Sequence, residues 1–202
     1  MAEHYSYKPA LLVAARHYSV DDTQVICTDK TGAEKWRMGW AEVTRAAYVE
    51  YTVKATRMRR LDLQAGPKAT EQTIGGNGGM GDPSRDPDTV AQLDLIAAIA
   101  TRLADRDEGF QVTFGEYGRA RRIIFVFGIV AMLSAVGLTV LTLVTGVSSD
   151  GIIEAAVPFG VVFVMGVLLF WSNAPWRPVP QMSARGLAEY LRRKVHPADA
   201  PE

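Results

Sequence analysis

The chain of 202 residues has very few of the residues that form covalent cross-links or metal sites. Its one cysteine, Cys27, cannot close an internal disulfide, and its three histidines lie far apart in the sequence. We therefore expect no disulfide framework and no structural zinc site. Neither sign of charge is in excess, because 22 Lys and Arg residues balance 22 Asp and Glu residues. This neutral sum argues against a protein held on nucleic acid by bulk charge, so we predict no nucleic-acid partner.

The short motifs of common catalytic and nucleotide-binding sites are also missing. No H-E-x-x-H, G-x-S-x-G or Walker string is present, and these patterns place a metal, a nucleophile or a phosphate. Residues 76–81 match G-x-G-x-x-G as a string, but Asp82 and Pro83 follow where a helix would have to open on the pyrophosphate. We interpret residues 75–83 as a flexible glycine-rich loop, and we predict no catalytic residue, no cofactor and no bound metal.

Charge is absent from one long stretch of the chain. Residues 123–144 contain no charged side chain. As a helix this run would extend roughly 33 Å, which matches a hydrocarbon core of about 30 Å. A second apolar run, residues 152–171, carries one charge, Glu154. We predict that each run spans a membrane, with a buried core helix as the alternative. The short link at residues 145–151 would then join the two spans as a transmembrane hairpin.

The basic residues that flank these runs indicate an orientation. Arg119, Arg121 and Arg122 precede the first run, Arg177 and Arg185 follow the second, and the link contains no Lys or Arg. Positive residues near the ends of a span mark its cytoplasmic side. We therefore expect a multi-pass protein with both termini in the cytoplasm, and we expect the three arginines before the first run to contact the membrane surface or a partner.

Residues 1–118 are predicted to form a folded cytoplasmic domain. Residues 34–40 alternate Trp36, Met38 and Trp40 with polar residues, which is typical of a half-buried strand. Further strands are expected at residues 11–20, 23–28, 45–54, 57–64 and 71–74. A helix is expected to begin near Asp86 or Asp88, because apolar residues then recur at spacings of three and four as far as residue 103.

Strands followed by one amphipathic helix and two apolar runs resemble a known arrangement. The segments that carry the resemblance are YSVDD at residues 18–22, GWAEV at 39–43, LIAAIATRL at 95–103 and NAPWRP at 173–178. They are similar to small bacterial membrane proteins with a cytoplasmic pleckstrin-homology-like (PH-like) domain followed by a transmembrane hairpin. The resemblance implies an α+β fold, in which one C-terminal helix caps a small antiparallel barrel, and a location in the bacterial inner membrane. It implies a scaffold and no catalytic residues.

Small residues and one carboxylate are the candidate contact sites within the hairpin. Gly128 and Gly160 permit close approach of a neighbouring helix. That neighbour is either the other span, another copy of the chain or another membrane-protein subunit. Glu154 is costly inside a span and is by default a functional candidate. It lies three residues after Gly151, so it is either at the far interface or in contact with a partner.

A basic cluster is the candidate lipid site of the domain. Its members lie on adjacent predicted strands and are Lys54, Arg57, Arg59 and Arg60. Such a cluster could bind anionic head groups. The alternative is a solvated strand face, because the acidic neighbours Glu50 and Asp62 would neutralise the cluster.

The predicted organisation has three parts: a PH-like domain at residues 1–118, a hairpin at 119–176 and a cytoplasmic tail at 177–202. The tail is expected to contain a short amphipathic helix at residues 183–195, which lies either on the inner leaflet or in solvent. We predict a non-enzymatic integral membrane protein that acts as an accessory or scaffold subunit. It would bind membrane lipid and either a larger membrane complex or itself. The alternatives are a small oligomeric transporter or channel component that uses Glu154, and an enzyme of unknown chemistry.

Overall fold

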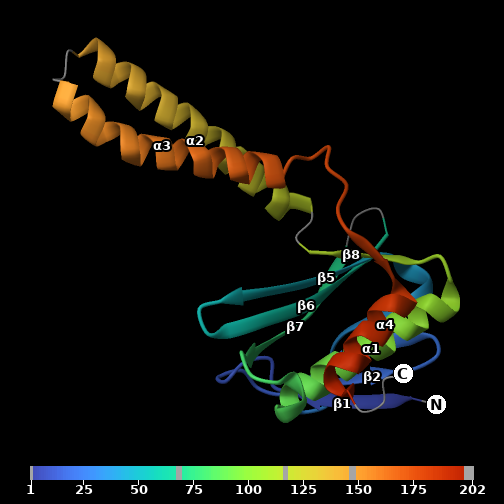
Figure 1. Ribbon diagram of the computed structural model, residues 1–202. Coiled ribbons are helices and arrows are strands. Elements are labelled where there is room, and N and C mark those ends of the chain that lie inside the picture. Colours follow the sequence, from blue (N-terminus) through green and yellow to red (C-terminus); the bar gives the residue numbers. More distant parts are fainter. Residues whose placement is uncertain (1, 67–69, 116–117, 146–148, 198–202) are drawn as a thin grey trace. The chain divides into compact units, whose positions relative to one another are not determined.

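The computed structural model describes residues 2–66, 70–115, 118–145 and 149–197 (Figure 1). The chain divides into two compact units. The first contains residues Met1–Gly115 and Pro180–Glu202, and the second contains residues Glu116–Val179. Within the described residues the fold is mixed α and β, with two sheets and four α-helices, which confirms the predicted class at that level.

The first sheet contains four antiparallel strands that pair in chain order. They are β1 (Glu3–Tyr7), β2 (Arg16–Val20), β3 (Gln24–Thr28) and β4 (Glu34–Gly39). The strand predicted at residues 11–20 is therefore wrong in its first half. Residues 11–13 lie in a turn that the Val13 amide closes by donating to the Ala10 carbonyl oxygen, 3.0 Å away. The polar segment at residues 3–7, which no pattern singled out, forms the edge strand.

The second sheet has the strand order β7-β6-β5-β8-β9. Its strands are β5 (Val43–Val53), β6 (Thr56–Ala65), β7 (Thr70–Gly79), β8 (Gln111–Phe114) and β9 (Gln181–Ser183). The single turn η1 (Trp40–Glu42) connects the two sheets along the chain. All neighbours are antiparallel except β5 and β8, which run parallel.

Strand β7 corrects the prediction of a glycine-rich loop. The strand continues to Gly79, and Gly76 and Gly78 face the helix α1 (Pro87–Arg106). A Cβ atom at Gly76 would lie 2.6 Å from the Gln92 side-chain oxygen, and one at Gly78 would lie 2.6 Å from Thr89 Oγ1. The glycines are thus needed because the helix lies directly on the strand, and the missing side chains make room for it.

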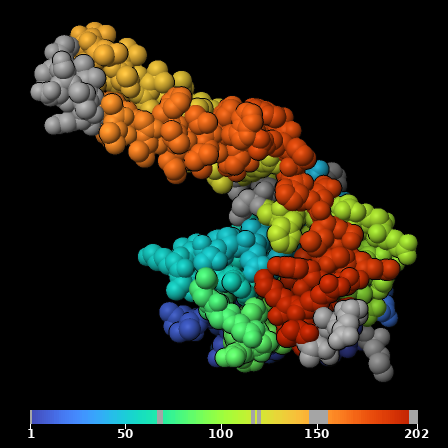
Figure 2. All heavy atoms as spheres, viewed as in Figure 1, coloured from blue at the N-terminus to red at the C-terminus, as the bar shows by residue number. Residues whose placement is uncertain are grey.

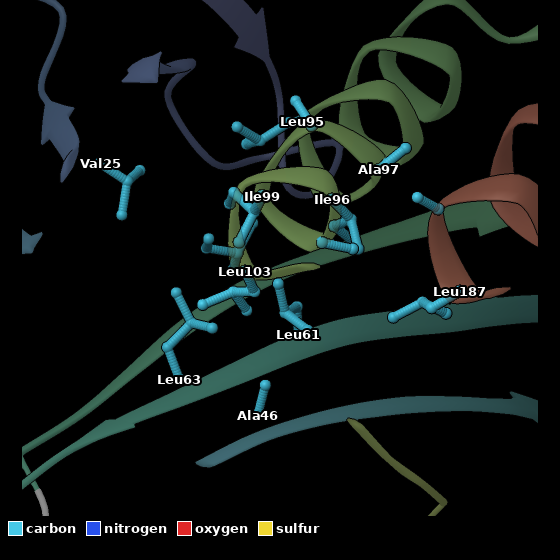
Figure 3. Packing of buried hydrophobic residues seen from close by; sticks show 14 of the residues in the cluster. Val25, Ala46, Leu61, Leu63, Leu95, Ile96, Ala97, Ile99, Leu103 and Leu187 are labelled. Atoms are coloured by element: carbon cyan, nitrogen blue, oxygen red, sulfur yellow. The ribbon is translucent and has the colours of Figure 1, made fainter. Parts of the chain in front are cut away.

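Helix α1 supplies much of the core, and its predicted start is confirmed. The Asp86 carboxylate accepts from the Asp88 amide and caps the helix after the single turn η2 (Pro83–Arg85). Figure 3 shows the buried side chains of the helix directed towards the strands. Those labelled on the helix are Leu95, Ile96, Ala97, Ile99 and Leu103, and those on the second sheet include Leu61 and Leu63.

Residues after the apolar runs complete the first unit instead of forming a separate tail. Strand β9 pairs with β8, and α4 (Ala184–Val195) packs beside α1 (Figure 1). Five side chains of α4 are fully buried: Ala184, Leu187, Ala188, Leu191 and Val195. The amphipathic helix predicted here is present, but its apolar face is covered by protein and is not available to the inner leaflet.

The second unit is a pair of helices, α2 (Gly118–Val144) and α3 (Ser149–Ser172). They are antiparallel, because residues near the start of α2 contact residues near the end of α3. The Arg121 guanidinium, for example, donates to the carbonyl oxygens of Ala174 and Arg177 at 2.7 and 2.9 Å. Among the described residues, one helix is long and apolar enough to cross a membrane, Arg121–Val144, with a mean hydropathy of 2.6. The described apolar part of α3, Ala156–Ser172, is shorter.

Candidate functional site

The two helices of the second unit touch through glycine. A Cβ atom added to Gly128 would lie 2.6 Å from the Phe170 nitrogen and 2.9 Å from the Gly166 carbonyl oxygen. One added to Gly166 would lie 2.9 Å from the Met132 nitrogen. These distances are too short for real side chains, so the backbones of α2 and α3 approach each other as closely as two glycines allow. Gly128 therefore belongs to the contact inside the helix pair.

Gly160 has a different environment from Gly128. A Cβ atom there would meet no other atom within 4 Å, and the residue is exposed. Gly166, and not Gly160, is thus the partner of Gly128. The sequence contained a signal for this pairing. In an antiparallel pair, residues equidistant from the link face each other, and 128 and 166 are both 19 positions from residue 147.

Aromatic and basic side chains gather where α2 begins and α3 ends. The rings of Phe125 and Phe170 stack with centroids 5.0 Å apart, and Trp176 lies 5.6 Å from the first and 5.8 Å from the second. The Arg177 guanidinium lies 4.6 Å from the Trp171 ring centroid. Aromatic rings beside arginines are typical of a membrane–water interface.

The remaining candidate contact residues of the hairpin differ in their surroundings. Arg121 binds the two carbonyl oxygens beyond α3, so it connects the ends of the helices. Arg122 is exposed beside the apolar side chains of Ile123 and Val126. Arg119 and Glu154 belong to α2 and α3, but their side chains lie outside the described residues. Their predicted contacts with the membrane or a partner stay predictions.

The basic cluster on the strands is divided between two faces of the sheet. Arg57 and Arg59 lie on the face that carries Glu50, because Glu50 is directly opposite Arg59 in the register. Arg60 points to the other face, where its Nε atom is 3.0 Å from the buried Asp62 carboxylate. Lys54 is exposed in the turn between β5 and β6, where its φ is 54°. The four residues therefore do not form one continuous patch, and their binding to anionic lipid stays a prediction.

Glu50 is the centre of a charged network that sequence reasoning did not find. Its carboxylate accepts from Arg59 Nε at 3.2 Å, and Lys194 Nζ lies 2.7 and 2.8 Å from its two oxygens. Arg57 Nε is 3.7 Å away. Burial raises the pKa of Glu50, but the hydrogen bond and charge of Lys194, with those of Arg59, outweigh burial and hold this pKa below its ordinary value.

Arg59 is the most deeply buried charged group of this network. The residue is only 2% exposed, and its two terminal nitrogens have no hydrogen-bond partner among the described residues. A buried guanidinium with unpaired donors depends on its ion pair with the Glu50 carboxylate for compensation. Alternation along β6 puts Arg59 on the same face as the buried Leu61 and Leu63, but Lys194 is 144 residues away from Glu50. No local pattern could have indicated that the tail supplies the second cation.

Neither a metal site nor a relative adds to this description. Within the described parts of the chain, no three His, Cys, Asp or Glu side chains gather as metal ligands would. The prediction that the protein has no catalytic residue and no cofactor stays a prediction. Comparison of the chain with protein-family models, curated proteins and solved structures finds no match.

Proposed function

We propose that the protein is an integral membrane protein of the bacterial inner membrane. In this proposal a cytoplasmic PH-like domain is held at the membrane by the α2–α3 hairpin. The protein acts as a non-enzymatic accessory or scaffold subunit that binds a larger membrane complex or another copy of itself.

The pairing of β8 with β9 is the observation that carries the proposal. Val112 pairs with Met182, the Phe114 amide donates to the Pro180 carbonyl oxygen at 2.8 Å, and the Ala184 amide donates to the Phe110 carbonyl oxygen at 2.9 Å. The chain before α2 and the chain after α3 therefore belong to one sheet and must lie on the same side of any membrane. An apolar segment between them crosses twice or not at all, so one span through α2 requires a second through α3.

The surfaces of the two helices support the double crossing. The large apolar side chains of α2 are exposed along its length, with Leu133 at 67% and Val144 at 79%. Those of α3 are exposed as well, including Val157 and Leu168. In water such surfaces would be unfavourable and prone to association, whereas hydrocarbon covers them at no cost. The described side chains between Ala156 and Ser172 carry no charge.

The order of elements in the first unit supports the PH-like part of the proposal. Four antiparallel strands are followed by three more, β5 to β7, and then by α1, which packs across the open side of the strands. Strands β8 and β9 and helix α4 are additions to that arrangement. A domain of this kind presents surfaces for binding, so we assign it a role in binding partners.

Topology reporters test the membrane part of the proposal. Fusions at the N-terminus, in the link near Ser149 and at the C-terminus should report cytoplasm, exterior and cytoplasm. A cytoplasmic signal from the link would mean that neither helix crosses the membrane, and it would overturn the hairpin. A single crossing is excluded because β8, before the helices, pairs with β9, after them.

Purification in mild detergent followed by mass spectrometry tests the role as a subunit. A stoichiometric membrane partner, or a stable homo-oligomer without ion flux, is the expected result. A homo-oligomer that conducts ions in vesicles would favour the transporter or channel alternative. That alternative depends on Glu154, whose side chain lies outside the described residues.

A further inference from the structure

The turn between β1 and β2 displays two leucines almost completely to solvent. Leu11 and Leu12 are each 97% exposed, and Val13 beside them is 42% exposed. Single exposed apolar residues are ordinary, but consecutive ones at the tip of a turn lose the favourable free energy that burial would provide. Such a tip is expected where something other than water covers it.

Hydrogen bonds hold this turn in place on the domain. The Asn77 amide of β7 donates to the Pro9 carbonyl oxygen at 2.8 Å, and the Lys8 amide donates to the Asp88 carboxylate at 2.9 Å. The Val13 amide closes the turn on Ala10. These hydrogen bonds attach the backbone of the turn to the domain, so binding would not have to order a loose segment.

Further apolar side chains lie at the same end of the domain. A groove of about 750 Å³ is lined by Leu11, Leu12 and Val13 together with Thr56, Gly78 and Gly79, and also by Asp86 and Asp88. Val53 pairs with Thr56 across the β5–β6 hairpin, and Met80 follows Gly79. Both are about half exposed. We call the set Leu11, Leu12, Val13, Val53 and Met80 the apolar tip. Figure 2 shows the segments that carry it, deep blue, cyan and green, at one end of the first unit.

The chain also leaves the first unit towards this end. Strand β8 runs parallel to β5 and ends at Phe114, opposite Tyr48. Beyond Tyr48, β5 continues in the same direction for five residues to Val53, a distance of roughly 17 Å. The chain returns at Pro180, which pairs with Phe114. Strand β8 thus ends at Phe114, and the chain re-enters the sheet at Pro180, at the end of the first unit towards which the apolar tip projects.

The charges around the apolar tip are mixed. Lys54 is exposed beside Val53, and the exposed Arg85, five positions after Met80, lies 3.9 Å from the Asp82 carboxylate. Acidic side chains lie there too, but they accept hydrogen bonds from backbone amides, as Asp82 does from Ser84 and Asp86 from Asp88. Apolar side chains next to Lys and Arg suit the boundary between head groups and acyl chains.

We infer that the apolar tip inserts into the interfacial layer of the bilayer that α2 crosses. The occupant of the surface is thus lipid, and the domain contacts the membrane through the tip as well as through its two covalent connections. The inference rests on the proposed membrane insertion of the helix pair. It adds that one particular end of the domain faces the bilayer.

Depth measurements on the full chain in phosphatidylcholine vesicles test the inference. Cys27→Ala removes the one native thiol, and single cysteines are then introduced for an environment-sensitive fluorophore. Leu12→Cys probes the tip. Glu108→Cys is the matched control, in the exposed loop before β8 at the other end of the second sheet. Leu133→Cys marks the membrane helix. Thermal melting of each variant checks that the fold is retained.

Lipid that carries a nitroxide on its acyl chain should quench the label at 12 and at 133, and should leave the label at 108 unquenched. Adding Leu11→Asp should lower the quenching at 12 about tenfold, because a charge replaces a side chain that lipid would bury. Position 11 is almost fully exposed, so this change leaves the fold intact.

The other outcomes separate the inference from the proposed function. If the label at 133 is quenched and the label at 12 behaves like that at 108, the helix is inserted and the inference is wrong. If 133 is not quenched either, the proposed function fails, and the inference fails with it. A label at 12 that is shielded only in native membranes, and not in pure lipid, would overturn the inference in favour of a protein partner.

Discussion

The two units of this chain differ in what they bury. The first buries large apolar side chains, and the second brings the backbones of two helices into close contact. In the first unit, large apolar side chains from two sheets and two helices fill a common core, and charged groups are excluded or paired. In the second unit, most large apolar side chains point outward, and the contact between helices is made by Gly128 and Gly166. The proposed insertion of the second unit into lipid accounts for this difference. Water drives apolar side chains into a core, whereas in lipid close backbone packing has to hold helices together.

Removing the segment that follows the apolar helices, which contains β9 and α4, should unfold the first unit. A chain ending at Gly115 loses α4 and its five buried side chains. Their burial contributes about 6–11 kcal/mol, which is comparable with the whole free energy of unfolding of a typical domain, about 5–15 kcal/mol. We expect no cooperative thermal transition in circular dichroism. The matched control joins Gly115 to Pro180 by a short flexible linker and should melt cooperatively. A sharp transition in the truncated chain would show that α4 is dispensable.

Gly128→Leu should separate the two helices while leaving the first unit folded. The side chain would have to occupy space held by the Phe170 and Gly166 backbones, and a clash with backbone cannot be relieved by rotating a side chain. We expect loss of cross-linking between cysteines placed on α2 and α3 in detergent. Gly160→Leu is the control and should preserve it, because that position is open. Equal cross-linking in both variants would contradict the glycine contact.

Glu50→Gln should destabilise the first unit by about 2–4 kcal/mol in urea unfolding, because the buried Arg59 loses its carboxylate. Lys194 loses the same partner. Glu34→Gln removes the exposed ion pair with Arg37 and should change stability by less than about 1 kcal/mol. Similar effects of the two changes would mean that the Glu50 network is as weak as a surface pair.

Acid should weaken the first unit partly through Glu50. Its folded pKa is lowered, so its contribution is present above its unfolded pKa of about 4.3. That contribution is lost as pH falls through the lower folded pKa. Unfolding free energies measured from pH 7 downward should therefore fall less steeply below about pH 4.3 in Glu50→Gln than in the original chain. Parallel curves for the two proteins would exclude this contribution.

Local sequence patterns were sufficient to predict the elements that bury one face at a regular spacing. Trp36, Met38 and Trp40 indicated β4, and the stripe from Val90 to Leu103 indicated α1. They failed where a distant element decides the structure. Gly76 and Gly78 are typical of a loop in sequence, but they pair with Arg59 and Arg57 of β6, and α1 packs directly on them. The charged network around Glu50 likewise includes Lys194 from the other end of the chain, beside the buried Arg59.

The pairing of β8 with β9 also has a consequence for the order in which the protein is made. Residues up to Gly115 leave the ribosome before the apolar helices, yet β9 and α4 are synthesised last. On the proposed topology, the surface that α4 covers therefore stays exposed until both helices have been inserted and β9 and α4 have been synthesised. A chain whose second helix fails to insert would leave α4 on the wrong side and the core permanently open, exposed to proteases. On that topology, completion of the domain would report that insertion has succeeded.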